Sequence, residues 1–220
     1  MPPPPPPLRI LVVDDHAVVR RGVRSLLESH EGWEVCGEAT TGRDAVEQSR
    51  RLHPDVVVMD LSLPELNGLD ATRQILKDAP ETEVLVLTMH HSEELARDVL
   101  QAGARGYVLK ADADENLIAA VDTLRQHKPF LTSAVTEFVL GDYVRRGDDE
   151  QRDHADAVTP REREIIQLVA EGQSNKEAAT TLGISVKTIE AHRASIMKKL
   201  HLRSVSDLVR YAIRNKIVQP

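Results

Sequence analysis

The sequence has little cysteine and few aromatic residues, and it has no long apolar run. Its single cysteine, Cys36, excludes an internal disulfide and a cysteine-built zinc or iron–sulfur centre. Aromatic residues make up 3% of the chain, and no stretch approaches the roughly 18 apolar residues that a membrane helix needs. The proline run Pro2–Pro7 lacks the cationic and apolar blocks of a signal peptide. We therefore expect a cytoplasmic protein that does not contact membranes, with residues 1–7 as a disordered proline tail.

What is present is ordinary for a globular protein, except for the placement of charge. The 220 residues are 41% hydrophobic and 29% charged, and this length suggests one large domain or two small ones. Residues 1–155 hold 17 Lys and Arg against 28 Asp and Glu, whereas residues 156–220 hold 11 against 7. A small basic part attached to a larger acidic one suggests nucleic-acid contact, although ordinary charge scatter stays open at this point.

The first 128 residues alternate between short apolar runs and segments with helical periodicity. Ile10–Val13 and Val56–Met59 are continuously apolar, which is typical of strands buried on both faces of a parallel sheet. Five strand–helix units predict a doubly wound α/β domain with a five-stranded parallel sheet, which binds ligands at the carboxyl ends of its strands. The predicted strands are Leu8–Val13, Trp33–Ala39, Asp55–Met59, Glu83–Leu87 and Gly106–Leu109.

Polar residues that suit phosphoryl chemistry follow these strands. Three carboxylates at one sheet edge would repel each other without a cation, and Mg²⁺ prefers such oxygen ligands. Asp60 can act as a nucleophile on a phosphoryl group, while Lys110 would neutralise charge and Thr88 would offer a hydroxyl. A single strand-terminal Asp is more often a cap or turn residue, but five suitable residues at four strand ends favour a site. These residues are Asp14, Asp15, Asp60, Thr88 and Lys110. None of the nine histidines is expected to bind a metal.

Residues 8–128 resemble the receiver domain of a bacterial two-component response regulator, which has a flavodoxin-like fold. The matching segments are Ile10–Asp15, Met59–Pro64 with Asn67-Gly68, Val86–Thr88 and Gly103–Lys110. The resemblance implies that Asp60 accepts phosphate from a sensor histidine kinase. It implies that Asp14, Asp15, Asp60 and the backbone carbonyl of Ser62 hold Mg²⁺. It also implies that Thr88 and Tyr107 form a switch pair, with a static, half-buried strand residue as the alternative interpretation of Tyr107.

A second unit, residues 157–220, is rich in helix-start signals. Thr159–Glu162 and Ser174–Glu177 are capping boxes, while Ser185 and Ser204 are N-cap residues of two further helices. Two short helices around Gly183 match a helix-turn-helix, with Val186, Ile189, Arg193, Ile196 and Leu200 on one stripe. Residues 129–156 are expected to be a linker with a connecting helix, Ser133–Arg146, followed by the flexible segment Gly147–Ala155.

The amino-acid sequence of this unit closely resembles that of the LuxR-type DNA-binding domain. The resemblance rests on Thr159–Ile165, Ser174–Glu177, Leu182–Arg193 and Lys198–Leu200. The face of the second helix of the helix-turn-helix that carries polar and small residues can enter a major groove of DNA, and lysines around this face contact phosphates. The predicted DNA-binding residues are Lys176, Lys187, Thr188, Glu190, Ala191, His192, Arg193, Ala194, Lys198 and Lys199. The last helix would help dimer contact through Leu208, Val209 and Ile213, unless these are domain core.

Together the two parts are similar to a NarL/FixJ-type response regulator. The function that this implies is transcription regulation by a homodimer on double-stranded promoter DNA, activated when Asp60 is phosphorylated with Mg²⁺. Enzyme activity is expected only as self-phosphorylation from a donor and autodephosphorylation. Two alternatives stay open. One is a phosphorylation-independent helix-turn-helix regulator. The other is an aspartyl-phosphate phosphohydrolase, which Ser62 disfavours because such enzymes typically carry a second Asp at that position.

Overall fold

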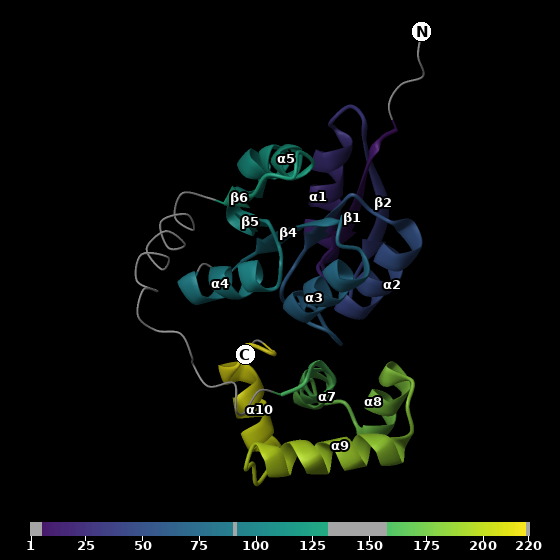
Figure 1. The fold of residues 1–220 in the computed structure, drawn as a ribbon, viewed down its shortest axis with the longest axis vertical. Helices are drawn as coiled ribbons and strands as arrows, with labels where there is room; N and C mark the ends of the chain where they lie inside the picture. The colour runs from purple at the N-terminus through teal and green to yellow at the C-terminus, as the bar shows by residue number, and fades with distance from the viewer. Residues whose placement is uncertain (1–5, 90–91, 132–157, 219–220) are drawn as a thin grey trace. The chain divides into compact units, whose positions relative to one another are not determined.

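The computed structural model describes residues 6–89, 92–131 and 158–218, which divide into two compact units (Figure 1). Several segments singled out in the sequence lie outside the described residues. They are most of the proline tail, His90-His91, the expected connecting helix Ser133–Arg146 and the segment Gly147–Ala155. The two units are described separately. Among the described residues, no helix is long and apolar enough to cross a bilayer.

The first unit is built on a six-stranded parallel sheet with strand order β2-β1-β3-β4-β5-β6. Its strands are β1 (Leu8–Val13), β2 (Trp33–Ala39), β3 (Val56–Met59), β4 (Glu83–Thr88), β5 (Gly106–Leu109) and β6 (Phe130–Leu131). The prediction of a doubly wound parallel sheet is confirmed, but the count of five strands is wrong. Phe130 and Leu131 pair with Gly106 and Tyr107 and add a sixth strand, which is too short to produce any alternation in the sequence.

In the part of the first unit that the structure describes, five α-helices cover the two faces of this sheet (Figure 1). They are α1 (Ala17–Glu28), α2 (Gly42–Leu52), α3 (Gly68–Asp78), α4 (Glu93–Gln101) and α5 (Ala113–Leu124), and a 3₁₀ turn, η1 (Lys110–Asp112), precedes α5. Helices α1 and α5 pack on one face, where Leu27 and Leu117 meet Ile10, Val58 and Leu85. Because helices lie on both faces, the central strands are buried throughout, which explains their unbroken apolar runs.

Cys36 lies in an irregularity of the sheet. The register between β1 and β2 shifts between Ile10 and Leu11, so that Ile10 pairs with Val35 and Leu11 pairs with Gly37. Cys36 is the extra residue, and its Sγ lies 3.4 Å from the carbonyl oxygen of Ile10. Burial raises the pKa of this thiol. Cys36 thus lies at a β-bulge of the sheet.

Within residues 158–218 the second unit has four helices: α7 (Pro160–Ala170), α8 (Asn175–Leu182), α9 (Val186–Lys199) and α10 (Val205–Arg214). Both predicted capping boxes are present, at Thr159 with Glu162 and at Ser174 with Glu177. Each box satisfies backbone N–H groups that the helix start leaves without partners, and a good cap is worth about 1 kcal/mol. Gly183 ends α8 with φ 64°, a left-handed conformation that glycine adopts without strain.

The core of this unit confirms part of the predicted α9 stripe. Ile189 and Ile196 are buried against α7 residues such as Ile165 and Ile166. Val186, on the same stripe, is 40% exposed and does not face the core. Val186 is the first residue of α9, so no preceding turn of this helix covers its side chain.

Candidate functional site

The predicted polar residues meet at the carboxyl edge of the sheet. Asp14 follows β1, and its backbone N–H donates to the carbonyl of Ala39 at the end of β2 (3.2 Å). Asp60 follows β3, and its N–H donates to the carbonyl of Val13 (2.9 Å). These bonds continue the ladder by one step beyond each strand and fix both backbones. Two carboxylates are therefore held side by side as the strands end.

Lys110 bridges these two carboxylates. Its Nζ lies 2.7 Å from Asp14 Oδ2 and 2.9 Å from Asp60 Oδ2, and all three side chains are at least nine-tenths buried. Lys110 follows β5 directly, so the parallel register delivers it to the same edge. The second oxygen of Asp60, Oδ1, accepts a hydrogen bond from the backbone N–H of Leu61 (2.8 Å).

The electrostatics of this cluster follow from its burial. Loss of solvent is the main reason that the pKa of Asp60 is raised, since burial penalises the charged carboxylate, and the nearby Asp14 adds to the effect. The bonds from Lys110 and Leu61 oppose this rise without cancelling it. For Lys110, burial alone would lower the pKa, but the hydrogen bonds to Asp14 and Asp60 outweigh it and leave the pKa raised. The ammonium therefore stays charged.

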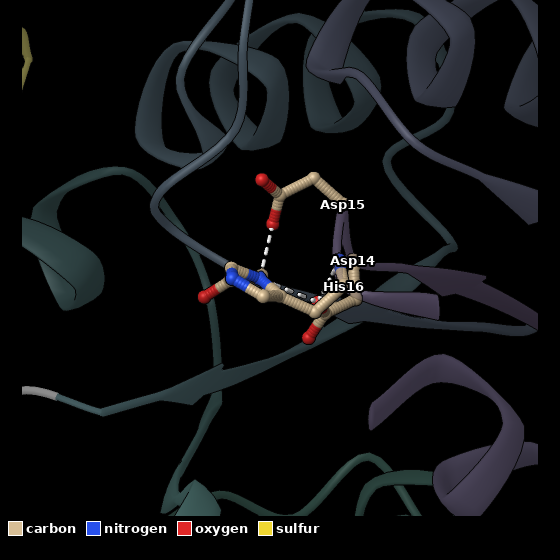
Figure 2. A group of neighbouring side chains, drawn as sticks. Asp14, Asp15 and His16 are labelled. Carbon is tan, nitrogen blue, oxygen red and sulfur yellow. Dashed lines mark hydrogen bonds and ion pairs between the residues drawn. The ribbon is translucent and has the colours of Figure 1, made fainter. Parts of the chain in front are cut away.

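Asp15 and His16 complete the rim of the cluster (Figure 2). Asp15 Oδ1 lies 2.6 Å from the imidazole Nδ1 of His16, which also lies 3.5 Å from Asp14 Oδ1. The backbone N–H of His16 donates to Asp14 Oδ1 (2.8 Å). These two side chains are more exposed than Asp14 and Asp60, and they form the open side of the site.

The donor set fits a divalent cation. Ligand atoms of Asp14, Asp15, His16 and Asp60 all lie within 4.8 Å of one another. Asp14 Oδ2 and Asp60 Oδ2 are buried and accept no hydrogen bond within the described part of the chain, apart from the ion pair with Lys110. Buried carboxylate oxygens in this state suit a hard cation such as Mg²⁺. Ser62 lies two residues beyond Asp60 in the loop before α3.

Thr88 and Tyr107 both lie in the sheet next to this edge. Thr88 is the last residue of β4 and is buried, in register with Leu109 of β5. Tyr107 is also buried, with 1% of its surface exposed, and burial raises the pKa of its phenol to about 12. The interpretation of a half-buried tyrosine is therefore wrong. The Tyr107 ring already lies inside the first unit in this structure.

In the second unit, α8 and α9 present the residues predicted to contact DNA. Lys176, Lys187, Glu190 and Lys198 are exposed, as are the small Ala191 and Ala194, while His192 is half-buried. Three others have partners within the unit. Arg193 donates to Asn175, Lys199 Nζ lies 2.8 Å from Glu162 Oε2, and the Thr188 hydroxyl lies 2.8 Å from that of Ser185.

Two family models match the chain. Residues 10–122 match "Response regulator receiver domain", and residues 156–212 match "Bacterial regulatory proteins, luxR family". The oxygen regulatory protein NreC of Staphylococcus epidermidis strain ATCC 35984 is 40% identical over 217 residues, which cover 96% of this chain and all of NreC. This chain is a LuxR-type two-component response regulator.

Other relatives of this response regulator give the same picture. The transcriptional regulatory protein MctR of Rhizobium johnstonii is 36% identical over 211 residues, covering 96% of this chain and 95% of MctR. RcsB of Salmonella enterica serovar Typhimurium, solved bound to a promoter, is 28% identical with a TM-score of 0.57, covering 93% of this chain and 97% of RcsB. The family consists of transcription regulators, not classical enzymes, so the phosphohydrolase alternative is not supported.

Sequence reasoning finds most of this response regulator's acidic cluster and misses one member. Asp14, Asp15, Asp60 and Lys110 come together as predicted from the strand ends. His16 is not expected from the sequence to take part in a metal site, yet its Nδ1 faces the carboxylates. The available signal is its position directly after Asp14-Asp15, because a residue at the start of a helix that follows a strand stays at the sheet edge.

Proposed function

We propose that this protein is a phosphorylation-activated transcription regulator. Asp60 accepts a phosphoryl group from a sensor histidine kinase, and the phosphorylated chain dimerises and binds promoter DNA in the cytoplasm. The observation that carries the proposal is the buried pair Asp14–Asp60 bridged by Lys110, in a chain that also carries an exposed helix-turn-helix face. A buried carboxylate beside a fixed ammonium is the arrangement that aspartyl phosphorylation needs.

The transfer exchanges one bond to phosphorus for another. A carboxylate oxygen of Asp60 attacks the phosphorus of a phosphohistidine, so that a P–O bond forms as the P–N bond breaks. The electron pair of the P–N bond returns to the imidazole of the kinase. Lys110 lies 2.9 Å from Asp60 Oδ2, close enough to neutralise charge on the incoming phosphoryl oxygens. Thr88 supplies a hydroxyl from the end of the neighbouring strand.

Asp14, Asp15, Asp60 and the carbonyl of Ser62 would hold Mg²⁺. When bound, this ion supplies charge neutralisation that the carboxylates need before an anionic group can approach. Asp14 and Asp60 contribute buried oxygens, and Asp15 contributes one at the exposed rim. In this proposal Thr88 and Tyr107 couple phosphorylation of Asp60 to a conformational change in the rest of the first unit.

The DNA-contacting surface in this proposal is the exposed face of α9 with the start of α8. The first turn of a recognition helix meets base edges, and flanking lysines meet phosphates. The last helix offers a dimer contact. Leu208 is buried within its own unit, whereas Ile213 is 37% exposed. Of these two apolar α10 residues, Ile213 is therefore the better candidate for contact with a second copy.

Phosphorylation should increase the DNA affinity of the full chain by at least about tenfold, since doubling the recognition surface adds contacts to a second half-site. The probe is a duplex selected from a random DNA pool by the chain treated with acetyl phosphate and Mg²⁺. Affinity and sedimentation are measured with and without the donor. Equal affinity and equal mass in both states would establish the phosphorylation-independent alternative instead.

Lys187→Ala should weaken binding to the selected duplex by roughly tenfold, because an exposed lysine in the first turn of α9 is placed to reach a base edge or phosphate. The matched control is Lys77→Ala, which removes the same charge from an exposed position at the end of α3. Circular dichroism confirms folding of both variants. If the two variants lose affinity equally, only net charge matters and the α9 face is not the reading surface.

A further inference from the structure

We propose that His16 is a further ligand of the divalent-cation site and shifts its preference from Mg²⁺ toward first-row transition ions. The inference rests on the proposed function, because it concerns the cation that supports phosphorylation of Asp60. It goes beyond that function by assigning a role to a side chain outside the carboxylate set. Three properties of the imidazole support it: the position of the ring beside the carboxylates, its exposure to solvent, and the preference of transition ions for a nitrogen ligand.

The imidazole is placed at the carboxylates by its own backbone. The His16 N–H donates to Asp14 Oδ1 (2.8 Å), which closes a tight turn at the end of β1. That turn directs Nδ1 to within 2.6 Å of Asp15 Oδ1 and 3.5 Å of Asp14 Oδ1 (Figure 2). Together with Asp60, the four donor groups lie within 4.8 Å of one another.

The contacts that the structure gives the His16 ring are those with Asp14 and Asp15 of the cluster itself. His16 is the residue before α1, yet its side chain makes no capping hydrogen bond. It is 67% exposed, so the ring can adjust, and the solvent-facing nitrogen can carry the N–H of the neutral tautomer. At 2.6 Å from the carboxylate oxygen Asp15 Oδ1, Nδ1 acts as an N–H donor, and it offers a lone pair to the cluster only when a cation displaces that proton. A cation placed between Nδ1 and Asp15 Oδ1 would take over the contact that these two atoms make with each other.

A second observation indicates that the cluster binds a ligand. Asp14 Oδ2 and Asp60 Oδ2 are buried, and among the described residues their one partner is the shared ammonium of Lys110, at 2.7 and 2.9 Å. Each carboxylate thus keeps binding capacity that one ammonium does not fill. On the opposite side of Asp14, Oδ1 faces His16, so the imidazole and Lys110 approach different oxygens of the same carboxylate.

Adding one nitrogen to a carboxylate set changes its selectivity. Mg²⁺ prefers oxygen ligands and gains little from an imidazole. Later first-row transition ions such as Co²⁺ bind nitrogen ligands more tightly than Mg²⁺ does. Their affinity for a given protein site generally exceeds that of Mn²⁺ and Fe²⁺. The site should therefore accept Mg²⁺ through its carboxylates and Co²⁺ through the carboxylates and His16 together.

The test compares dissociation constants of Mg²⁺ and Co²⁺ for the full chain by isothermal titration calorimetry at one pH. The binding event of interest is the one that Asp14→Asn removes. In His16→Asn the Co²⁺ affinity should fall about tenfold relative to that of Mg²⁺, in line with the loss of one ligand. The Mg²⁺ constant should change less than threefold. In the wild-type chain, Co²⁺ should also shift the imidazole NMR signals of His16.

His53→Asn is the matched control, because His53 is an exposed histidine of the same unit with φ 47°, a conformation that asparagine tolerates. It should leave both constants unchanged. If His16→Asn weakens both ions equally, or changes their ratio by less than about threefold, His16 only positions Asp15 and the inference is overturned. If neither ion shows an Asp14-dependent event in the wild-type chain, the proposed cation site itself fails, which is a separate result.

Discussion

Asp60→Asn should abolish labelling of the chain by a phosphodonor. An amide oxygen is a far weaker nucleophile than a carboxylate, and the amide cannot form a stable acyl phosphate. The expected result is loss of radiolabel from ³²P-acetyl phosphate with Mg²⁺, to below about 1% of the wild-type level, in line with the loss of a covalent nucleophile. The label on the wild-type chain should be released by hydroxylamine, which cleaves acyl phosphates.

The substitution should leave the fold intact. The oxygen of the new side-chain amide would still accept the Leu61 N–H, and Lys110 would keep its ion pair with Asp14 at 2.7 Å. Removing one of two adjacent buried carboxylates also removes their mutual repulsion. The melting temperature is therefore expected to be equal or higher, and this measurement separates a lost nucleophile from a lost fold.

Asp55→Asn is the matched control for this experiment. Asp55 precedes β3 whereas Asp60 follows it, so the two residues lie at opposite ends of one strand. Its Oδ2 accepts the backbone N–H of Arg9 (2.7 Å), a bond that an asparagine oxygen can also accept. Asp55→Asn should be labelled like the wild type. Full labelling of Asp60→Asn would place the nucleophile elsewhere and remove the central chemistry of the proposed function.

The sequence predicts this site well because parallel strands impose it. Asp14, Asp60 and Lys110 each follow a continuously apolar run, and such runs end at one edge in a doubly wound sheet. The direction of each strand and the order of the sheet then bring the three side chains together. No contact needs to be known in advance, since the topology alone makes residues distant in sequence into neighbours.

Other features depend on contacts that no local pattern encodes. β6 holds only Phe130 and Leu131, too few residues to show a period. Alternation places Tyr107 on one face of β5, but a strand covered on both faces buries either side. Arg193 shares the predicted DNA face in sequence, while its guanidinium donates to Asn175 at the start of α8. That pairing depends on how α8 and α9 cross.

His16 illustrates the same limit at the site. A lone histidine carries no metal-ligand spacing signal, and what separates His16 from the other eight in the sequence is its place directly after Asp14-Asp15. The imidazole is placed beside the carboxylates by the turn in which Asp14 Oδ1 accepts the His16 N–H. Two adjacent aspartates in the sequence do not by themselves specify this turn. Sequence reasoning thus identifies the carboxylates through topology, while the imidazole becomes visible only with side-chain geometry.

Gly68→Ala should damage both stability and phosphorylation, through a steric effect on Asp60. Gly68 begins α3, and its N–H donates to the carbonyl of Leu61 (3.0 Å), which holds the loop against the strand end. A Cβ at Gly68 would lie 2.0 Å from the backbone oxygen of Asp60 and 2.8 Å from the Cα of Leu61. Backbone atoms cannot swing away as a side chain can, so the Asp60–Leu61 segment must move.

The expected loss of stability is about 2–3 kcal/mol, at the upper end for overpacked sites. The expected labelling rate of the folded protein falls at least about tenfold, because a displacement of about 1 Å at a reacting group can reduce rates a hundredfold. Urea unfolding measures the first quantity. Initial rates with ³²P-acetyl phosphate and Mg²⁺, at a temperature where the variant is folded, measure the second.

Gly22→Ala provides the matched control, because Gly22 lies exposed within α1 and a Cβ there meets nothing within 4 Å. This substitution should raise stability by about 0.5–1 kcal/mol through helix propensity and leave labelling unchanged. Comparing the two variants separates the general effect of replacing a glycine in a helix from the steric effect of a Cβ that lies close to the Asp60 backbone. If Gly68→Ala unfolds like the wild type and is labelled at the wild-type rate, the loop does not constrain Asp60. If stability falls but the labelling rate holds, Gly68 supports the fold without positioning the phosphoacceptor.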